Sequence, residues 1–152
     1  MSIDPGIKQI LPLDFIKLEM NRHPRIRSVG LNHFSYLLKR YWAGFCPEDG
    51  AVFLDPTLDP VWLARVLNER HPGLLIKPEE VWYFIFYHEA GHSLLGEDEL
   101  QAEHYAKRAF VRWRNERDVA KKKIIQTIQD VVGEAIRESF KEVLAGEGGK
   151  PH

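Results

Sequence analysis

The stretch that decides the interpretation of this chain is His88-Glu89-Ala90-Gly91-His92, which lies near the middle of 152 residues. On an α-helix four residues advance the chain by about 6 Å and slightly more than one turn, so both imidazoles project from one face. One metal ion can bridge two histidines placed in this way, and the pattern is typical of catalytic zinc sites. Glu89 lies beside the pair and is expected to act as general base toward a water molecule on the zinc ion.

The residues around this motif predict a buried helix. Residues 81–87 form the most apolar run of the chain, which suits a helix in a core with its polar face turned to a cleft. Pro78, Glu79 and Glu80 precede that run and are favoured in a first helical turn, the two acids because of the helix dipole. Gly96 is typical of a helix C-terminus. We therefore expect the helix to end there.

A catalytic zinc ion needs a third protein ligand, and the candidates that follow the motif are Asp98, Glu99, Glu103 and His104. Gly96 allows the chain to turn back toward the histidines. Asp98 is then expected to cap a new helix, with Gln101 at its third position. Glu99 falls in the first turn of that helix, where the dipole favours an ionised carboxylate.

These considerations favour Glu99 as the third ligand, with Asp98 and Glu103 as the alternatives. Glu103 lies one turn after Glu99 on the same face and is expected to hold His88 or His92 through a hydrogen bond to the ring nitrogen that does not bind metal. A histidine in the position of His104 more often lies at the surface or behind a metal ligand than binds the metal itself.

At these positions the chain resembles known zinc peptidases. The motif followed by residues 99–106, Glu-Leu-Gln-Ala-Glu-His-Tyr-Ala, is similar to the gluzincin pattern of ImmA/IrrE-like peptidases and of minigluzincins related to CAAX-type proteases. Residues 87–96 also resemble the active-site string of membrane AAA zinc proteases. The resemblance covers residues 81–108 and implies a small zincin fold. It also implies roles for five residues: zinc ligands His88, His92 and Glu99, base Glu89, and supporting carboxylate Glu103.

The chain departs from these families in one spacing and fits a metzincin less well. Only six residues separate His92 from Glu99, fewer than is usual in gluzincins. A metzincin would have a glycine three residues after His92, where this chain has Leu95, and a histidine or aspartate at position 98, where it has Asp98. The chain has no methionine after Met20, so a downstream Met-turn is absent from the sequence.

Composition predicts one domain over residues 1–152 with a core that needs no disulfide. The net charge of −1 does not indicate an obligate nucleic-acid binder, and the single Cys46 suits a reducing compartment. No run approaches the about 20 apolar residues of a membrane span. We expect a soluble cytoplasmic protein without membrane contact.

The remaining segments predict an α+β fold dominated by helix, with a short antiparallel sheet and an active-site helix, and the resemblance implies that this is a small zincin fold. Two strands, residues 41–46 and 51–54, flank a turn at residues 47–50. If the second strand lay at the cleft edge, a substrate could add to it as an extended strand. Helices are expected at residues 14–21, 60–69 with Asp59 as cap, 98–113, and 118–145, whereas residues 31–41 suit a helix or the approach to a strand.

The last helix is amphipathic, with apolar residues at helical spacing from Ile124 to Val143. Such a stripe is typical of a core or of a dimer seam, so a homodimer through this helix is one expectation. Eight basic residues between Lys107 and Lys123 are most simply a solvated face. Their alternative role is to contact nucleic acid, and the near-neutral charge then predicts weak, salt-dependent binding.

The function predicted from the sequence is a zinc-dependent peptidase, a metallopeptidase of the HExxH type with Zn²⁺ as cofactor and a peptide or protein as substrate. An oxyanion partner is expected from elsewhere in the chain, and the residues considered are Tyr105, Tyr87 and His71. The alternative is a binding or regulatory module that keeps the zincin fold with little or no turnover. Glu89 favours the enzyme, because a structural zinc ion needs no base and usually has cysteine ligands.

Overall fold

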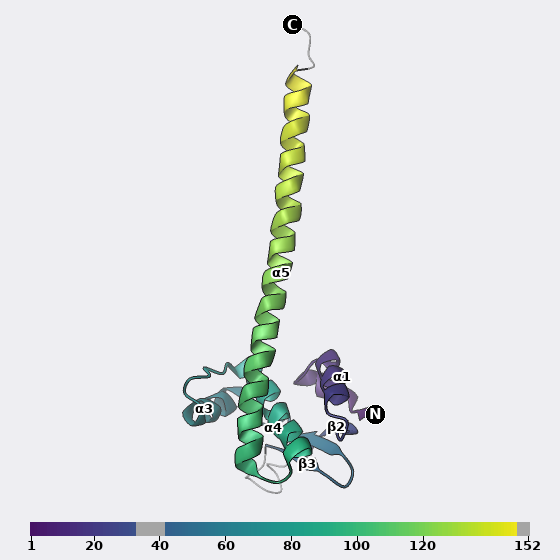
Figure 1. The fold of residues 1–152 in the computed structure, drawn as a ribbon, viewed down its shortest axis with the longest axis vertical. Coiled ribbons are helices and arrows are strands. Elements are labelled where there is room, and N and C mark those ends of the chain that lie inside the picture. The colour runs from purple at the N-terminus through teal and green to yellow at the C-terminus, as the bar shows by residue number, and fades with distance from the viewer. Residues whose placement is uncertain (33–41, 149–152) are drawn as a thin grey trace. The chain divides into compact units, whose positions relative to one another are not determined.

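The computed structural model describes residues 1–32 and 42–148 and confirms an α+β fold dominated by helix (Figure 1). By its internal contacts the chain divides into two compact units, residues 1–112 and 113–152. The first unit contains the sheet, the helices α1, α3 and α4, and the beginning of α5. Among the helices of the described ranges, none has the length and apolarity needed to cross a membrane.

The described part of the sheet has four short strands in the order β1-β2-β4-β3. Their bounds are Ser2–Ile3 for β1, Ser28–Leu31 for β2, Ala43–Cys46 for β3 and Ala51–Leu54 for β4. The expected hairpin is confirmed, since β3 and β4 pair antiparallel with Cys46 opposite Ala51. Gly50 closes the turn with a φ of +64°, where a side chain would meet the Arg25 carbonyl oxygen.

The expectation of an antiparallel sheet is wrong for the other two pairings, because β1–β2 and β2–β4 are parallel. The chain leaves β1 through the 3-10 helix η1 (Pro5–Gln9) and the helix α1 (Leu13–Arg22) before it enters β2. A crossover of this kind returns the chain to the same end of the sheet and makes the strands parallel, whereas a tight turn makes them antiparallel. Strands β1 and β2 were not expected from the sequence.

The expected helices in the first 70 residues are confirmed within one residue. Helix α1 was expected at residues 14–21, and α3 (Pro60–Arg70) at residues 60–69. Asp59 caps α3 by accepting a hydrogen bond of 3.0 Å from the Val61 backbone N–H. Residues 33–41 lie outside the described ranges, so the helix-or-strand expectation for residues 31–41 can be compared only at Leu31, which ends β2, and at Asn32, which follows it.

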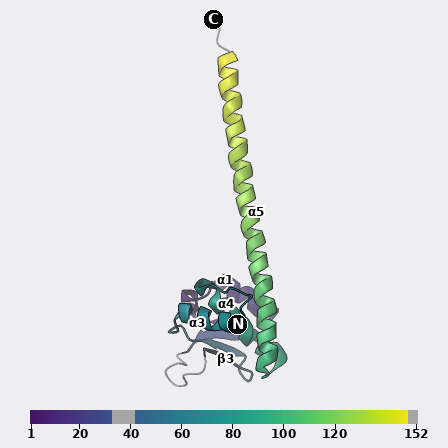
Figure 2. The same cartoon turned by 90° about the vertical axis from the view of Figure 1, so that its left-hand side faces the viewer.

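Helix α4 (Val81–Leu95) carries the His-Glu-x-x-His motif and forms the centre of the core (Figure 2). It follows the 3-10 turn η2 (Pro78–Glu80), in agreement with the predicted acidic first turn. Its apolar residues from Val81 to Tyr87 are buried except Tyr83, as expected for a helix that is apolar on all sides. Phe15 of α1 packs edge-on against Tyr83, Phe86 and Tyr87.

The structure has one helix, α5 (Glu99–Gly148), where two were expected. The predicted interruption between Trp113 and Asp118 is wrong, because that segment contains neither glycine nor proline and its residues continue a helix at low cost. The cap at Asp98 is confirmed: its carboxylate accepts a hydrogen bond of 3.1 Å from the Gln101 backbone N–H.

The first turns of α5 pack closely on α4 at Gly91. A Cβ atom at Gly91 would lie 3.1 Å from the Ala102 Cα atom and 3.2 Å from the Ala102 carbonyl oxygen. Ala102, Ala106 and Phe110 of α5 are buried, and the Phe110 ring lies 5.8 Å from the Phe84 ring of α4. This contact holds the beginning of α5 beside the histidine motif.

Candidate metal centre

The two motif histidines come together on one face of α4. Their Nε2 atoms lie 3.2 Å apart, as expected for positions separated by four helical residues. Each ring is fixed through its other nitrogen. His88 Nδ1 lies 2.6 Å from a Glu103 carboxylate oxygen, and His92 Nδ1 lies 2.7 Å from the Gly96 carbonyl oxygen.

These contacts indicate which tautomer each ring adopts when it is neutral. The ionised Glu103 carboxylate and the Gly96 carbonyl only accept hydrogen bonds, so each Nδ1 is the donor and each neutral ring has its lone pair on Nε2. The two lone pairs then face one another across 3.2 Å. Neutral rings in this state cannot hydrogen-bond to each other, and both can bind a shared cation.

Glu99 completes the cluster from the first turn of α5. One carboxylate oxygen lies 2.9 Å from His88 Nε2, and the other lies 3.1 Å from His92 Nε2. The chain reaches this position because Gly96 has a φ of +87°, which allows α4 to end and the chain to reverse. One ligand atom from each of His88, His92 and Glu99 lies within 4.8 Å of the others, and this group could hold a metal ion.

Glu103 lies behind the cluster and contacts two histidines. Besides its bond to His88 it accepts a hydrogen bond of 2.8 Å from His71 Nε2. Burial alone would raise the pKa of Glu103, but the bonds from His88 and His71 outweigh it and lower the pKa to about 2. The carboxylate thus stays ionised and orients the His88 ring.

The other two candidates for the third ligand lie elsewhere. The Asp98 carboxylate caps α5 through the Gln101 backbone N–H, and the Asp98 carbonyl accepts from the Ala102 N–H. His104 is exposed on α5. Neither belongs to the group of ligand atoms formed by His88, His92 and Glu99.

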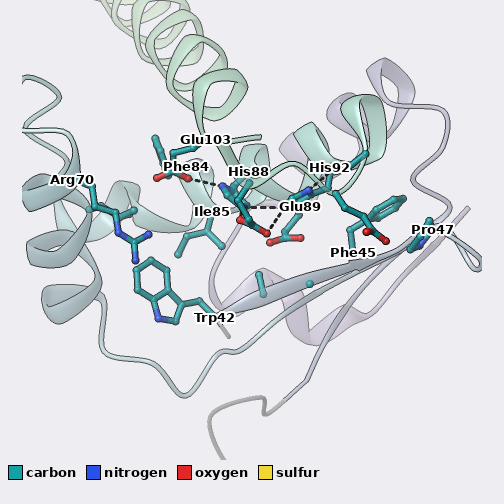
Figure 3. A pocket seen from close by; sticks show the side chains of 16 residues that line it. Trp42, Phe45, Pro47, Arg70, Phe84, Ile85, His88, Glu89, His92 and Glu103 are labelled. Atoms are coloured by element: carbon teal, nitrogen blue, oxygen red, sulfur yellow. Dashed lines mark hydrogen bonds and ion pairs between the residues drawn. The ribbon is translucent and has the colours of Figure 1, made fainter. Parts of the chain in front are cut away.

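Glu89 is almost fully buried and borders the same cavity as the cluster (Figure 3). Burial raises the pKa of its carboxyl group to about 7, although the neighbouring His88 and His92 lower it. A carboxyl group with a pKa near neutrality can both accept and donate a proton.

The cavity has a volume of about 790 Å³, which is within the usual range for small-molecule and peptide sites. One wall is strand β3, through Ala43, Gly44 and Phe45. Apolar side chains from α3 and α4 form another part of the lining, namely Leu67, Phe84 and Ile85. The cluster of His88, His92 and Glu99 lies at the same cavity.

Sequence reasoning missed two residues of this cavity, Trp42 and Arg70. The Arg70 guanidinium carbon lies 4.9 Å from the centre of the Trp42 ring (Figure 3). Arg70 is the only lysine or arginine among the described residues that line the cavity, and no described carboxylate forms an ion pair with it. The sequence offers no signal for this pair, because an arginine in the last turn of a helix is common.

The three residues considered as oxyanion partners do not line the cavity. The Tyr87 hydroxyl donates a hydrogen bond of 2.9 Å to the buried Glu19 carboxylate of α1. The Tyr105 hydroxyl contacts Nε2 of His23, a buried residue that follows α1. His71 is bonded to Glu103. These residues hold α1, α3 and α5 around α4, and they do not face the cluster.

Comparisons with protein-family models, with curated proteins and with solved structures gave no match. The resemblance to gluzincins therefore stays a prediction, carried by the motif residues and by the geometry of the site.

Proposed function

We propose that this protein is a zinc-dependent peptidase. The observation that carries the proposal is the convergence of two histidine Nε2 lone pairs and the Glu99 carboxylate on one point, with both Nδ1 protons held by other groups. With both rings neutral, these three acceptors have no donor between them, and a cation, either a metal ion or a proton on one ring, offsets their repulsion. The buried carboxyl group of Glu89 beside the same point adds a proton acceptor that a structural metal site does not need.

The residues present fit zinc. Two imidazole nitrogens and one carboxylate oxygen form the three-ligand set of a catalytic zinc site, which keeps one position open. Zinc bound by His88, His92 and Glu99 would supply a Lewis acid that polarises a carbonyl group and lowers the pKa of water toward about 7. Glu103 and the Gly96 carbonyl hold the histidines in the required tautomer.

Glu89 carries the proton in the reaction. Its carboxylate takes a proton from the attacking water molecule and returns it to the amine that leaves when the peptide bond breaks. Burial supports both steps, since it raises the pKa of the carboxyl group to about 7 and keeps bulk water away from it.

Strand β3 offers a binding mode for an extended peptide. Strand β4 has neighbours on both sides, β2 and β3, so it does not meet the condition, exposure at an edge, under which a substrate could add to it. Within the described ranges β3 pairs with β4 alone, and it borders the cavity. A peptide that adds to β3 would run along the wall of the cavity, next to the ligand cluster.

Arg70 provides a preference for negatively charged substrates. Its guanidinium group borders the cavity and rests on Trp42, without a described carboxylate as partner. A substrate carboxylate, from an acidic side chain or from a peptide C-terminus, would pair with it. Among the lining residues that the structure describes, the other ionisable groups are carboxylates and the two motif histidines, and the carboxylates disfavour acidic groups elsewhere in the cavity.

The rival function is a binding module with little turnover, which would use the cavity and would not need Glu89. The two functions are separated by metal analysis together with a peptide-cleavage assay. We expect about one zinc ion per chain in the purified protein, cleavage of an unstructured protein substrate, loss of cleavage on chelation, and recovery when zinc is restored. Absence of zinc or any substitute divalent ion after reconstitution would overturn the proposal, and metal-loaded protein without cleavage would favour the binding module.

A further inference from the structure

The second unit, residues 113–152, leaves a broad apolar stripe exposed. Ten large apolar side chains of α5 in this unit are each 50 to 65% exposed: Val119, Ile124, Ile125, Ile128, Val131, Val132, Ile136, Phe140, Val143 and Leu144. Most follow one another at intervals of three or four residues and therefore lie along one side of the helix. Exposed apolar surface of this extent marks an interaction site.

The stripe is large enough to hold two copies together. A side chain of this size presents roughly 100 Å² of apolar surface, so ten of them present on the order of 1000 Å². A standard specific interface buries about 800 Å² per partner. A second helix packed along the stripe would thus bury a sufficient area.

The distribution of charge along the helix indicates what packs against the stripe and in which direction the partner helix runs. Residues 113–127 contain five basic and two acidic residues, a net charge of +3, whereas residues 128–146 contain two basic and four acidic residues, a net charge of −2. Lys121 lies one turn before Ile124 and Ile125, on the same side of the helix. Glu138 and Glu142 follow Val131 by seven and eleven residues, which returns both to the side of the stripe.

We propose that the second unit pairs with a second copy of this chain as an antiparallel two-helix seam. In a parallel pair Lys121 and Lys122 would face their own copies, and so would Glu138 and Glu142. In an antiparallel pair the basic half of each helix meets the acidic half of the other. The acidic half also disfavours an anionic membrane surface as the occupant of the stripe.

An antiparallel pair centred near Val132 aligns the apolar side chains in layers. Residue i then faces residue 264 − i of the partner copy, so Ile124 meets Phe140 and Ile128 meets Ile136. Lys122 meets Glu142 in the same alignment. One centre therefore matches these apolar layers and one charge pair, and Lys121 then faces Val143, the neighbour of Glu142.

The oligomeric state is tested by sedimentation velocity of the full chain over a range of concentrations. We expect a dimer, and we expect Ile128→Glu with Ile136→Glu to convert it to a monomer. These side chains are more than half exposed in the single chain, so the first unit should stay folded and keep its metal. A wild-type chain that stays monomeric at about 100 μM, or that associates with vesicles and not with itself, would overturn the proposal.

The direction is tested by reversing charges. Lys121→Glu with Lys122→Glu should weaken self-association at least tenfold, and so should Glu138→Lys with Glu142→Lys. Mixing the two variant chains should restore the dimer, because each then supplies the half that the other lacks. Lys123→Glu with Lys141→Glu, on the opposite side of the helix, changes the net charge by the same amount as the Lys121 and Lys122 variant and is its matched control. Full dimerisation of each variant alone would overturn the antiparallel arrangement.

Distances between spin labels give an independent measure. In a Cys46→Ser background, labels at Lys123→Cys in both copies should be separated by about 27 Å along the helix axis, because 18 residues rise 1.5 Å each. A label at position 123 of one copy and one at position 141 of the other should lie at the same height along the axis, so this mixed pair should give a shorter distance than the like pair. The reverse result, with the like pair at the same height and the mixed pair offset by about 27 Å along the axis, would show a parallel pair and overturn the proposal.

Discussion

Helix α4 and the part of α5 in the second unit are both rich in apolar residues, but the structure uses them differently. In α4 the apolar residues from Val81 to Tyr87 occur on all sides and are buried except Tyr83, and the motif residues His88, Glu89 and His92 border one cavity. In the second unit the ten large apolar side chains from Val119 to Leu144 follow a stripe and are at least half exposed. The motif histidines of α4 are held by hydrogen bonds of 2.6 and 2.7 Å, whereas the charged groups of the second unit are mostly exposed. Reactive chemistry is therefore expected on α4 and association on the second unit.

The largest expected effect comes from removing one buried group of α4. Glu89→Gln keeps the shape of the side chain but removes the proton acceptor, and peptide cleavage should fall by about 100 to 10,000-fold. Zinc content and thermal stability should change little, because Glu89 is not among the ligand atoms of the cluster. Initial rates and metal analysis on the same preparations measure both. Undiminished cleavage would assign the activity to another protein in the sample.

The next largest effect distinguishes the three carboxylates that follow α4 by how much each contributes to zinc affinity. Glu99→Ala removes a ligand atom from the cluster and should weaken zinc binding more than Glu103→Ala, for which about 10 to 100-fold is expected. Asp98→Ala is the control, since it removes a helix cap worth about 1 kcal/mol and should leave zinc affinity nearly unchanged. Competition with a chromophoric chelator gives the three affinities. A larger loss for Asp98→Ala than for Glu99→Ala would contradict the cluster.

Alanine substitutions at two glycines inside helices, one in α4 and one in the second unit, test how closely each region is packed. Gly91→Ala would place a Cβ atom 3.1 to 3.2 Å from the α5 backbone at Ala102, and we expect it to destabilise the protein by about 1 to 3 kcal/mol. Gly133→Ala meets only the end of the Arg137 side chain at 4.0 Å, and should stabilise the helix by about 1 kcal/mol.

Thermal unfolding of the metal-free variants, followed separately for each unit, measures these opposite signs. Stabilisation by Gly91→Ala would show that α4 and the beginning of α5 are less closely packed than the structure indicates.

The smallest effect concerns the cavity wall. Arg70→Ala should raise the KM of a peptide that carries a carboxylate near the cleaved bond by about tenfold, the value of one charge-assisted contact at a partly exposed site. Paired substrates with Glu or Gln, and with a free or amidated C-terminus, identify which carboxylate is bound. Arg65→Ala, an exposed arginine of the same helix that does not line the cavity, is the control. Equal losses on the neutral substrates would contradict a charge-based preference.

The sequence by itself determined the helix that carries the motif, the hairpin turn, helix α3 and the Asp98 cap. Each depends on neighbours within a few residues: apolar periodicity, capping side chains, or a glycine at a turn. The placement of His88 and His92 on one face follows in the same way, because four residues of helix fix it. The continuous α5 was missed because the segment between Trp113 and Asp118 has no strong local preference to stop or to continue.

Only the tertiary structure decided what surrounds those histidines. The parallel pairings of β1, β2 and β4 depend on how α1 returns the chain to the sheet. The bridge from Glu103 to His71, the bond from Tyr87 to Glu19, and the contact of Arg70 with Trp42 join residues that are far apart in the chain. The physical reason is that local periodicity determines which face a residue occupies, whereas its contacts depend on which distant face packs against it and excludes water.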